Sequence, residues 1–274
     1  MISAQLEAFI EYITIIKALS SSSIDAYSKD LSLIEEFCKK DLVKIDEVQL
    51  LQYLSQFDNK RTLNRKLSSI NAFFSFCHQE FSNIQSEKRK LKFSKVPSTL
   101  PKYLSFEEIM SGLNSIDRSS WIGLRDYALL LFLYATGLRI SECLSIEHND
   151  IEELWLRVRH AKGDKERLVP IAQEAIQALK VYENECPFES TSLWLNYQGK
   201  VLSRISAYKI SRKYLNVSPH VIRHSYATAL ILGGADLRVV QELLGHSSLL
   251  TTQIYTHIQK QNLQDTLLKF HPMA

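Results

Sequence analysis

The sequence predicts a mainly α-helical protein with one small antiparallel β-sheet, organised as an N-terminal helical bundle followed by a second, mainly helical domain. Three observations lead to this prediction. Apolar residues recur every third or fourth position through residues 1 to about 90, a proline-containing stretch interrupts that pattern at residues 93–102, and strict alternation occurs only in residues 154–171. The chain has 274 residues, of which 45% are hydrophobic and 23% charged, values typical of a folded protein with one large or two ordinary domains.

Four helices are predicted in the first domain, residues 1–92. The first helix has an apolar stripe at Leu6, Phe9, Ile10, Ile13, Ile16 and Lys17. Serines 20–23 then form a polar break that can cap a second helix, whose stripe is Ile24, Tyr27, Leu31, Ile34 and Phe37. A third helix covers residues 46–56 and a fourth about residues 60–81, with Leu63, Leu67, Ile70, Phe73, Phe74 and Cys77 facing inward. Because the joints between them are short, these helices should form a compact bundle.

Residues 93–102 contain Pro97 and Pro101 and are interpreted as a linker to a second domain, residues 103–274. Ser105 and Glu108 have the spacing of a capping box, which predicts the start of a helix. A strongly apolar helix follows over residues 125–134. Thr136-Gly137 should end it, with a new helix beginning near residue 139 or 140.

The β-sheet is predicted from residues 154–171, where apolar Leu154, Leu156 and Val158 alternate with polar or bulky residues. A turn at Gly163-Asp164 joins the two strands and places Lys162 at the tip of the hairpin. From residue 172 onward the pattern is helical, with interruptions at Pro187, Gly199 and Gly233-Gly234.

The charge of the chain says only a little about its binding partners. The net charge of +3 is weak support for a nucleic-acid partner by itself. Two basic clusters are more informative, although solvated helix or strand faces explain either one equally well. The first cluster is Lys60, Arg61, Arg65, Lys66, Lys88, Arg89, Lys90 and Lys92, and the second is Arg157, Arg159, His160, Lys162, Lys165 and Arg167.

Nothing in the sequence predicts a membrane protein or a secreted one. The longest apolar stretch, residues 127–134, is far shorter than the roughly 20 residues needed to span a bilayer, and the first residues lack a signal-peptide pattern. Cys38, Cys77, Cys143 and Cys186 lack disulfide and metal-ligand spacing. We therefore expect reduced thiols, a cytoplasmic location, and neither a metal nor another cofactor.

The residues that carry chemistry are spread over four short motifs. These motifs are Ala135–Glu142, Lys162–Pro170, Pro219–His224 and Gly233–His257, and they contain the candidate catalytic residues Arg139, Lys162, His220, Arg223, His246 and Tyr255. Attack by a phenolate on a phosphodiester builds negative charge on the non-bridging oxygens, which guanidinium groups bind with two parallel donors. A tyrosine with a reference pKa of about 10 needs a base or a positive field to lose its proton, and the leaving oxygen needs a proton donor.

In these motifs and their order, the chain resembles the tyrosine recombinases of the Xer type, the phage-integrase-like enzymes that resolve chromosome dimers in bacteria. The resemblance extends over nearly the whole chain. It implies that Tyr255 attacks the DNA to give a 3′-phosphotyrosyl link and a free 5′ hydroxyl, and that Arg139 and Arg223 hold the scissile phosphate. The partner strand's 5′ hydroxyl then reseals the link, without a metal or a nucleotide.

The resemblance also implies roles for the remaining candidates. Lys162 would protonate the leaving oxygen, His220 would assist the tyrosine, His246 would contact the phosphate, and Glu142 would support the site. The implied partners are a double-stranded recombination site, four protomers assembled on two such sites with the C-terminal helix docked on a neighbour, a paralogous recombinase and a septal DNA translocase. The target would be a dif-like site used in chromosome segregation.

Several alternatives stay open from the sequence. Lys165 on the same hairpin is the rival to Lys162, and each candidate has a structural explanation when taken alone. The stretch between residues 195 and 218 is shorter than in relatives, which leaves details of DNA contact open. Three other functions fit less well: an integrase of a phage or mobile element, a type IB topoisomerase-like enzyme, and a DNA-binding module without catalysis.

Overall fold

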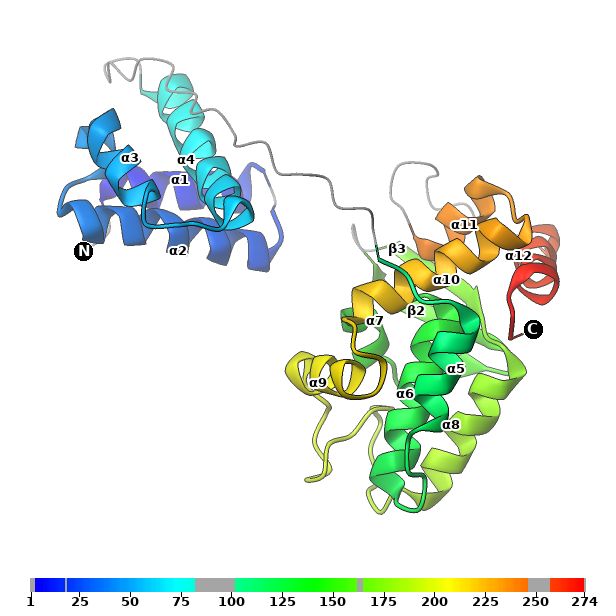
Figure 1. The fold of residues 1–274 in the computed structure, drawn as a ribbon. Helices are drawn as coiled ribbons and strands as arrows, with labels where there is room; N and C mark the ends of the chain where they lie inside the picture. Colours follow the sequence, from blue (N-terminus) through cyan, green and yellow to red (C-terminus); the bar gives the residue numbers. More distant parts are fainter. Residues whose placement is uncertain (1–2, 18, 82–101, 162–164, 246–256, 274) are drawn as a thin grey trace. The chain divides into compact units, whose positions relative to one another are not determined.

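The chain divides into two compact units, Met1–Thr99 and Leu100–Ala274, in the computed structural model (Figure 1). The structure describes residues 3–17, 19–81, 102–161, 165–245 and 257–273. Of the predicted linker, residues 93–101 lie outside these ranges. Each unit has its own hydrophobic core, so each is described separately.

The described part of the first unit is a bundle of α-helices with one short 3₁₀ turn, as predicted. Its elements are α1 (Ala4–Ile15), α2 (Ser21–Cys38), η1 (Leu42–Lys44), α3 (Glu47–Leu54) and α4 (Lys60–Glu80). Local caps fix three of the helix starts, because the side chains of Ser3, Asp46 and Asn59 accept hydrogen bonds from the first turns of α1, α3 and α4. The core is formed by the predicted stripes, including Phe9, Ile34 and Phe73.

Three positions of the predicted stripes do not face this core, and one of them is the exposed Lys17. Ile16 lies just beyond the end of α1 and is 70% exposed, and Phe37 near the end of α2 is 44% exposed. The apolar periodicity of a sequence can continue to the end of a helix, whereas the neighbouring helices that cover its apolar face can end earlier. Phe37 still contacts the ring of Tyr53, with centroids 5.4 Å apart.

A buried polar cluster joins α2 to α4 inside the first unit. Asp30, which is 2% exposed, accepts hydrogen bonds from Lys66 Nζ at 3.2 Å and from Ser69 Oγ at 3.2 Å, and it also pairs with Arg65. Lys66 is itself buried and donates to the hydroxyl of Tyr53 at 2.9 Å. Lys66 and Arg65, predicted as part of a basic surface cluster, therefore serve partly to neutralise a buried carboxylate.

The second unit combines helices with one three-stranded sheet, which confirms the predicted fold class. Its helices are α5 (Phe106–Asn114), α6 (Trp121–Thr136), α7 (Ile140–Leu144), η2 (His148–Asp150), α8 (Gln173–Glu185), α9 (Arg204–Leu215), α10 (Pro219–Gly233), α11 (Leu237–Leu244) and α12 (His257–Phe270). The predicted capping box of Ser105 and Glu108 is present at the start of α5. Figure 1 shows α6 between α5 and α8, with α10 crossing beside it.

Helix α6 is the centre of this unit. Every residue from Ala128 to Thr136 is buried, and the helix packs against α8, α10 and α5. Gly137 ends it in the left-handed conformation, with φ of +61°, as the sequence predicted. A helix that is apolar on all sides is stable only when neighbours cover it completely, and α6 meets that condition.

The sheet contains the predicted hairpin and one strand that was not predicted. Strands β2 (Trp155–Ala161) and β3 (Lys165–Pro170) are antiparallel, with Leu156 opposite Val169 and Val158 opposite Arg167. Strand β1 (Ile151–Glu152) pairs with the start of β2. Two residues are too few to show an alternating pattern, so β1 could not be predicted from periodicity. Residues 162–164, the tip of the hairpin with Lys162, lie outside the described residues.

Residues 186–203 differ from the expected helical pattern. They form a loop region with two isolated bridges, Glu147 to Ser192 and Leu195 to Val201, before α9 begins. The expected stop at Gly233-Gly234 is present, since α10 ends there and Gly234 has φ of +104°.

The last helix packs on its own chain. α12 contacts α10, α11 and β3, and Leu263, Leu267 and Met273 belong to the core of the second unit. His271 follows the helix and is buried between the rings of Tyr134 and Tyr226.

The cysteines that were expected to be reduced are free in the structure. Cys77 and Cys143 are buried, and burial raises the pKa of the Cys77 thiol to about 11. Among the described helices, none is long and apolar enough to cross a membrane.

Candidate functional site

The carboxylate of Glu142 is the centre of a cluster of arginines in the second unit. It accepts hydrogen bonds from Arg139 Nη1 at 2.8 Å and from Arg167, whose Nη1 and Nη2 lie 3.1 and 2.9 Å from its two oxygens. Arg223 Nη1 lies 3.9 Å from the same carboxylate. Residues separated by more than eighty positions in the sequence therefore meet around one acidic group.

The end of α6 explains how Arg139 and Glu142 come together. After the left-handed turn at Gly137 the chain enters α7, and Arg139 is the residue at its N-cap. The Glu142 side chain accepts a hydrogen bond from the Arg139 backbone nitrogen at 2.8 Å as well as from its guanidinium. This double contact holds the arginine backbone and side chain in one orientation.

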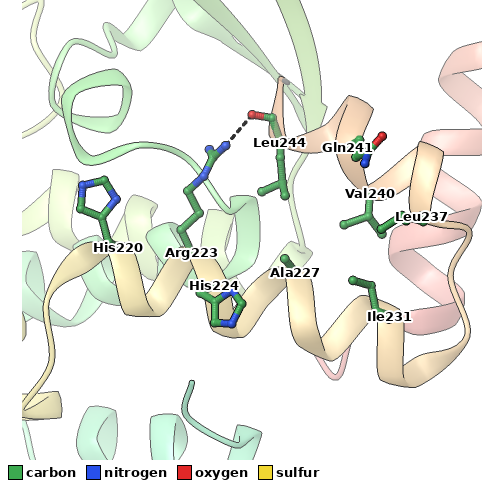
Figure 2. Close-up of a pocket in the computed structure, with 9 residues that line it drawn as sticks. All are labelled: His220, Arg223, His224, Ala227, Ile231, Leu237, Val240, Gln241 and Leu244. Atoms are coloured by element: carbon green, nitrogen blue, oxygen red, sulfur yellow. Dashed lines mark hydrogen bonds between the residues drawn. The ribbon is translucent and has the colours of Figure 1, made fainter. Parts of the chain in front are cut away.

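Arg223 reaches this cluster from α10. Pro219 occupies the first turn of that helix, where the missing backbone N–H costs nothing. Arg223 donates from Nη1 to the carbonyl of Gly137 and from Nη2 to the carbonyl of Leu244, both at 2.7 Å. Its guanidinium thus links the end of α6 to the end of α11, and Figure 2 shows the contact to Leu244.

The charges of the cluster affect each other's pKa values. Burial alone would raise the pKa of the Glu142 carboxyl, but the hydrogen bonds and charge of Arg167, together with Arg139, outweigh it and lower that pKa to about 2. Burial and the charge of Arg139 lower the pKa of Arg223 to about 10. Glu142 is therefore ionised and Arg223 charged at neutral pH. Three guanidinium groups around one carboxylate leave an excess of positive charge, which is suited to an anion.

A pocket of about 310 Å³ lies beside Arg223, between α10 and α11. His220, Arg223, His224 and Gln241 are its polar lining residues, and the apolar ones are Ala227, Ile231, Leu237, Val240 and Leu244. Figure 2 shows His220 one turn before Arg223 on α10. His220 is exposed, so a bound molecule can reach its ring.

Gly245 closes α11 next to the arginine cluster. It adopts the left-handed conformation with φ of +68°, and its carbonyl accepts a long hydrogen bond of 3.5 Å from Arg139 Nη2. A side chain at this position would meet the guanidinium of Arg167, with Cβ 2.9 Å from Cζ. The backbone of Gly245 thus lies directly on Arg167.

The structure places three of the six predicted site residues. Arg139 and Arg223 converge on Glu142, and His220 lines the pocket beside Arg223. Lys162, His246 and Tyr255 lie outside the described residues. The near rival Lys165 is in strand β3.

Arg167 is a site residue that the sequence analysis misjudged. It was assigned to a basic surface cluster, yet it is 5% exposed and paired with Glu142. Strand register contained the missing signal: Arg167 lies opposite Val158, an inward position, whereas its neighbour Leu168 lies opposite Arg157. Among the described residues, no group of three or more acidic, histidine or cysteine side chains is arranged to hold a metal ion.

Two family models match the chain and together cover most of it. The model of the phage integrase family matches residues 102–262, and the model of the phage integrase N-terminal SAM-like domain matches residues 6–80. The arginine cluster and the pocket lie within the first of these matches.

Individual proteins are similar over nearly the full chain. The tyrosine recombinase XerC of Thermodesulfovibrio yellowstonii is 33% identical over 97% of this chain and 95% of its own length. The tyrosine recombinase XerD of Listeria innocua is 31% identical over 98% of this chain and 99% of its own length. Among solved structures, the XerH site-specific recombinase bound to palindromic difH substrate, in a post-cleavage complex, is 27% identical with a TM-score of 0.67. That match covers 96% of this chain and 84% of XerH.

Proposed function

The chain belongs to the phage integrase family of tyrosine recombinases, enzymes that catalyse site-specific cleavage and rejoining of DNA, and from this membership we propose the roles of its individual residues. The phenolic oxygen of Tyr255 attacks the scissile phosphorus of a duplex recombination site. A 3′-phosphotyrosyl bond forms, the bond to the 5′ oxygen breaks, and a 5′ hydroxyl leaves. The observation that carries the proposal is the convergence of Arg139 and Arg223 on one carboxylate.

Arg139 and Arg223 bind the non-bridging oxygens of the scissile phosphate. Among the described residues, Arg139 uses Nη1 for Glu142 and otherwise makes only the long contact to Gly245, so much of its donor capacity is available to a ligand. Arg223 in the structure donates to the carbonyls of Gly137 and Leu244, which fix its guanidinium beside the pocket. Donors held in place before the reaction stabilise the charge that develops on the phosphate, which is commonly the largest catalytic effect.

The remaining proposed residues move protons or add donors. His220, exposed beside Arg223, accepts a hydrogen bond from the tyrosine or takes its proton. His246 follows Gly245 directly in the sequence and contacts the phosphate, and Lys162 protonates the leaving 5′ oxygen. These last two roles and that of Tyr255 rest on the sequence motifs and on the family.

Rejoining reverses the same exchange. The 5′ hydroxyl of a partner strand attacks the phosphotyrosyl phosphorus, the tyrosine regains its proton, and the phosphodiester bond is restored. One phosphoester bond replaces another in each step, so the bond energy is retained and the chain's own residues supply all the proton transfers.

A nicked suicide substrate tests the proposal directly. Fragmented DNA of the source genome is bound to the protein, and the shortest duplex protected from nuclease, here called the protected duplex, is resynthesised with a nick beside the scissile position. Wild-type protein should become covalently attached to this DNA, whereas Tyr255→Phe should bind it with similar affinity and form no covalent complex. Covalent capture by Tyr255→Phe would remove Tyr255 from the nucleophile role.

Chromosome dimer resolution at a dif-like site is the biological role we propose. Two curated relatives that match almost end to end are named XerC and XerD, and the similar XerH was solved on a difH substrate. A mobile-element integrase uses the same chemistry, and the matching family takes its name from phage integrases. The genomic position of the protected duplex separates the two: a site near the replication terminus supports dimer resolution, and a site at the border of a mobile element supports integration.

Assembly and location follow from this role. We propose that four protomers act on two sites in the cytoplasm, together with a paralogous recombinase, under activation by a septal DNA translocase. In the structure α12 packs on its own chain, so docking onto a neighbour requires this helix to leave its place. Mass measurement of the protein on the protected duplex tests the number of protomers.

A further inference from the structure

Among the described residues, Arg167 is the one whose guanidinium makes two hydrogen bonds to the Glu142 carboxylate. Its two terminal nitrogens each donate to a different oxygen of that carboxylate, at 3.1 and 2.9 Å, and both partners are less than one-tenth exposed. This two-pronged arrangement fixes the plane of the carboxylate as well as its position. Arg167, from strand β3, therefore holds Glu142 in the orientation in which it also meets Arg139.

Arg167 also supports the end of α11. The backbone of Gly245 lies against the guanidinium so closely that a Cβ there would stand 2.9 Å from Cζ, Nε and Nη1. The Arg167 Nε is buried and has no hydrogen-bond partner among the described residues. A guanidinium that leaves one donor unsatisfied is held by its other contacts, namely the carboxylate on one side and the glycine backbone on the other.

The contact of Arg167 with Glu142 affects Arg139 and Arg223, the two arginines proposed to bind phosphate. Glu142 carries one negative charge and contacts Arg139, Arg167 and Arg223. With both oxygens occupied by Arg167, the carboxylate takes a single side-chain donor from Arg139 and none within 3.5 Å from Arg223. Without Arg167, the freed oxygens attract Arg139 and Arg223 more strongly, and those donors are lost to the phosphate.

We propose that Arg167 is a positioning residue for DNA cleavage, which saturates Glu142 and supports the end of α11 so that Arg139 and Arg223 keep their donors for the scissile phosphate. The inference rests on the proposed function of those two arginines. Arg167 acts through Glu142 and Gly245 and does not itself touch the DNA.

A second buried arginine in the same unit provides a matched control. Arg125, on α6, is 6% exposed and donates to Asp126 from Nε and Nη2, at 3.0 and 2.6 Å. Within the described part of the unit, Arg125 shares no partner with the cluster around Glu142. The double variant Arg125→Gln/Asp126→Asn therefore removes a buried ion pair from the unit without leaving a charge unpaired and without touching the site.

The experiment measures single-turnover formation of the covalent complex on the nicked protected duplex, corrected for the fraction of folded protein. Arg167→Gln should react about 10–100-fold more slowly than wild type, the range for removing a group that orients a directly acting one. Its affinity for the duplex should change by less than about threefold, because many phosphate contacts share in binding. The control double variant should react at the wild-type rate.

Two further variants distinguish positioning from a general effect on folding. In Arg167→Gln/Glu142→Gln no carboxylate is left to attract Arg139 and Arg223, so this variant should cleave no more slowly than Arg167→Gln alone. It also removes the uncompensated buried charge and remains usable where Arg167→Gln folds poorly. Arg167→Lys keeps the charge but not the two-pronged geometry, and it should fall between wild type and Arg167→Gln.

A pH profile gives a readout that a structural role would not change. Arg139, Arg167 and Arg223 are the charged groups that face Glu142 among the described residues, and Arg167 contributes most to the low pKa of its carboxyl. In Arg167→Gln burial prevails and the pKa of Glu142 rises, so this carboxyl is neutralised at a higher pH than in wild type and releases Arg139 and Arg223; the difference in cleavage rate between Arg167→Gln and wild type should therefore narrow towards acid pH.

The outcomes separate the inference from the proposed function. A slow Arg167→Gln whose deficit narrows towards acid pH, together with a double variant that cleaves no more slowly than Arg167→Gln, supports the inference. Arg167→Gln that cleaves as fast as the Arg125/Asp126 control, with the wild-type pH profile, overturns it and leaves the proposed function intact. Wild-type protein that binds the protected duplex but never forms a covalent complex overturns both.

Discussion

Replacing Gly137 with alanine would test how strictly the end of α6 positions Arg223. Gly137 has φ of +61° and its carbonyl accepts a 2.7 Å hydrogen bond from Arg223 Nη1. An added methyl group would lie 2.6 Å from Cε1 and 2.9 Å from Cγ of Tyr226, a ring that is fully buried. The substitution therefore strains the backbone and overfills the core at the point where Arg223 is held.

The expected loss of stability can be worked out from these two effects. The left-handed conformation costs a residue with a side chain about 1–2 kcal/mol relative to glycine. Overpacking against a ring that cannot move away adds about 1–3 kcal/mol. The second unit should thus lose about 2–5 kcal/mol of unfolding free energy. A shift of the carbonyl by about 1 Å would move Arg223 with it and slow cleavage on the order of 100-fold.

Gly199→Ala is the matched control. Gly199 also has a positive φ, +73°, but the ring that its side chain would meet is Phe188, which is 36% exposed and free to turn aside. It should lose about 1–2 kcal/mol and cleave at the wild-type rate per folded molecule. Urea unfolding followed by circular dichroism gives the stabilities, and covalent capture on the nicked protected duplex gives the rates. Wild-type cleavage by folded Gly137→Ala would refute the reasoning.

Three further predictions concern separate parts of the chain. Lys162→Ala should cripple cleavage of an ordinary substrate, and a 5′-bridging sulfur at the scissile bond should restore it, because sulfur leaves without a proton; no rescue would transfer the acid role, with Lys165 the first alternative. Asp30→Asn should destabilise the first unit by about 3–5 kcal/mol in urea unfolding, because Lys66 stays buried without its carboxylate. Asp41→Asn, which removes an exposed pair with Lys44, should change it by less than about 1 kcal/mol, and equal losses would contradict the assignment. Burial lowers the pKa of His271 to about 4 from its usual 6.5, so the unfolded chain binds the proton first and stability should fall by about 3 kcal/mol between pH 6.5 and 4. His271→Phe should lack that fall in melting temperatures measured across this range, and a parallel fall in both proteins would show that another group titrates.

Helical periodicity predicted most of the fold because the long helices bury regular stripes. It predicted the four helices of the first unit and the apolar helix α6. The residues next to α6 also mark its ends, with a cap at its start and a glycine at its stop. It was wrong about Ile16 and Phe37, since exposure at a helix end depends on what lies opposite. Residues 186–203 carry no period, and the bridge from Ser192 to Glu147 arises only when distant segments meet.

The site was predictable as a set of residue types and not as an arrangement. Arg139 and Arg223 could be singled out by their motifs, but their common contact with Glu142 depends on how α7 and α10 pack. Arg167 shows the difficulty best. Its charge and its basic neighbours indicated a surface position, whereas the pairing register of β2 and β3 turns it inward to a buried carboxylate.

The position of α12 has a consequence for assembly. Leu263, Leu267 and Met273 already bury their side chains against their own chain. An assembly in which neighbouring chains exchange this helix buries the same apolar side chains between chains that are already buried within one chain. The exchange itself therefore supplies almost no net hydrophobic free energy. The proposed association of protomers would then draw its driving force from elsewhere, chiefly from the high effective concentration of chains bound side by side on one duplex. Free in solution, the chain gains no hydrophobic free energy when its last helix packs on another copy instead of on itself.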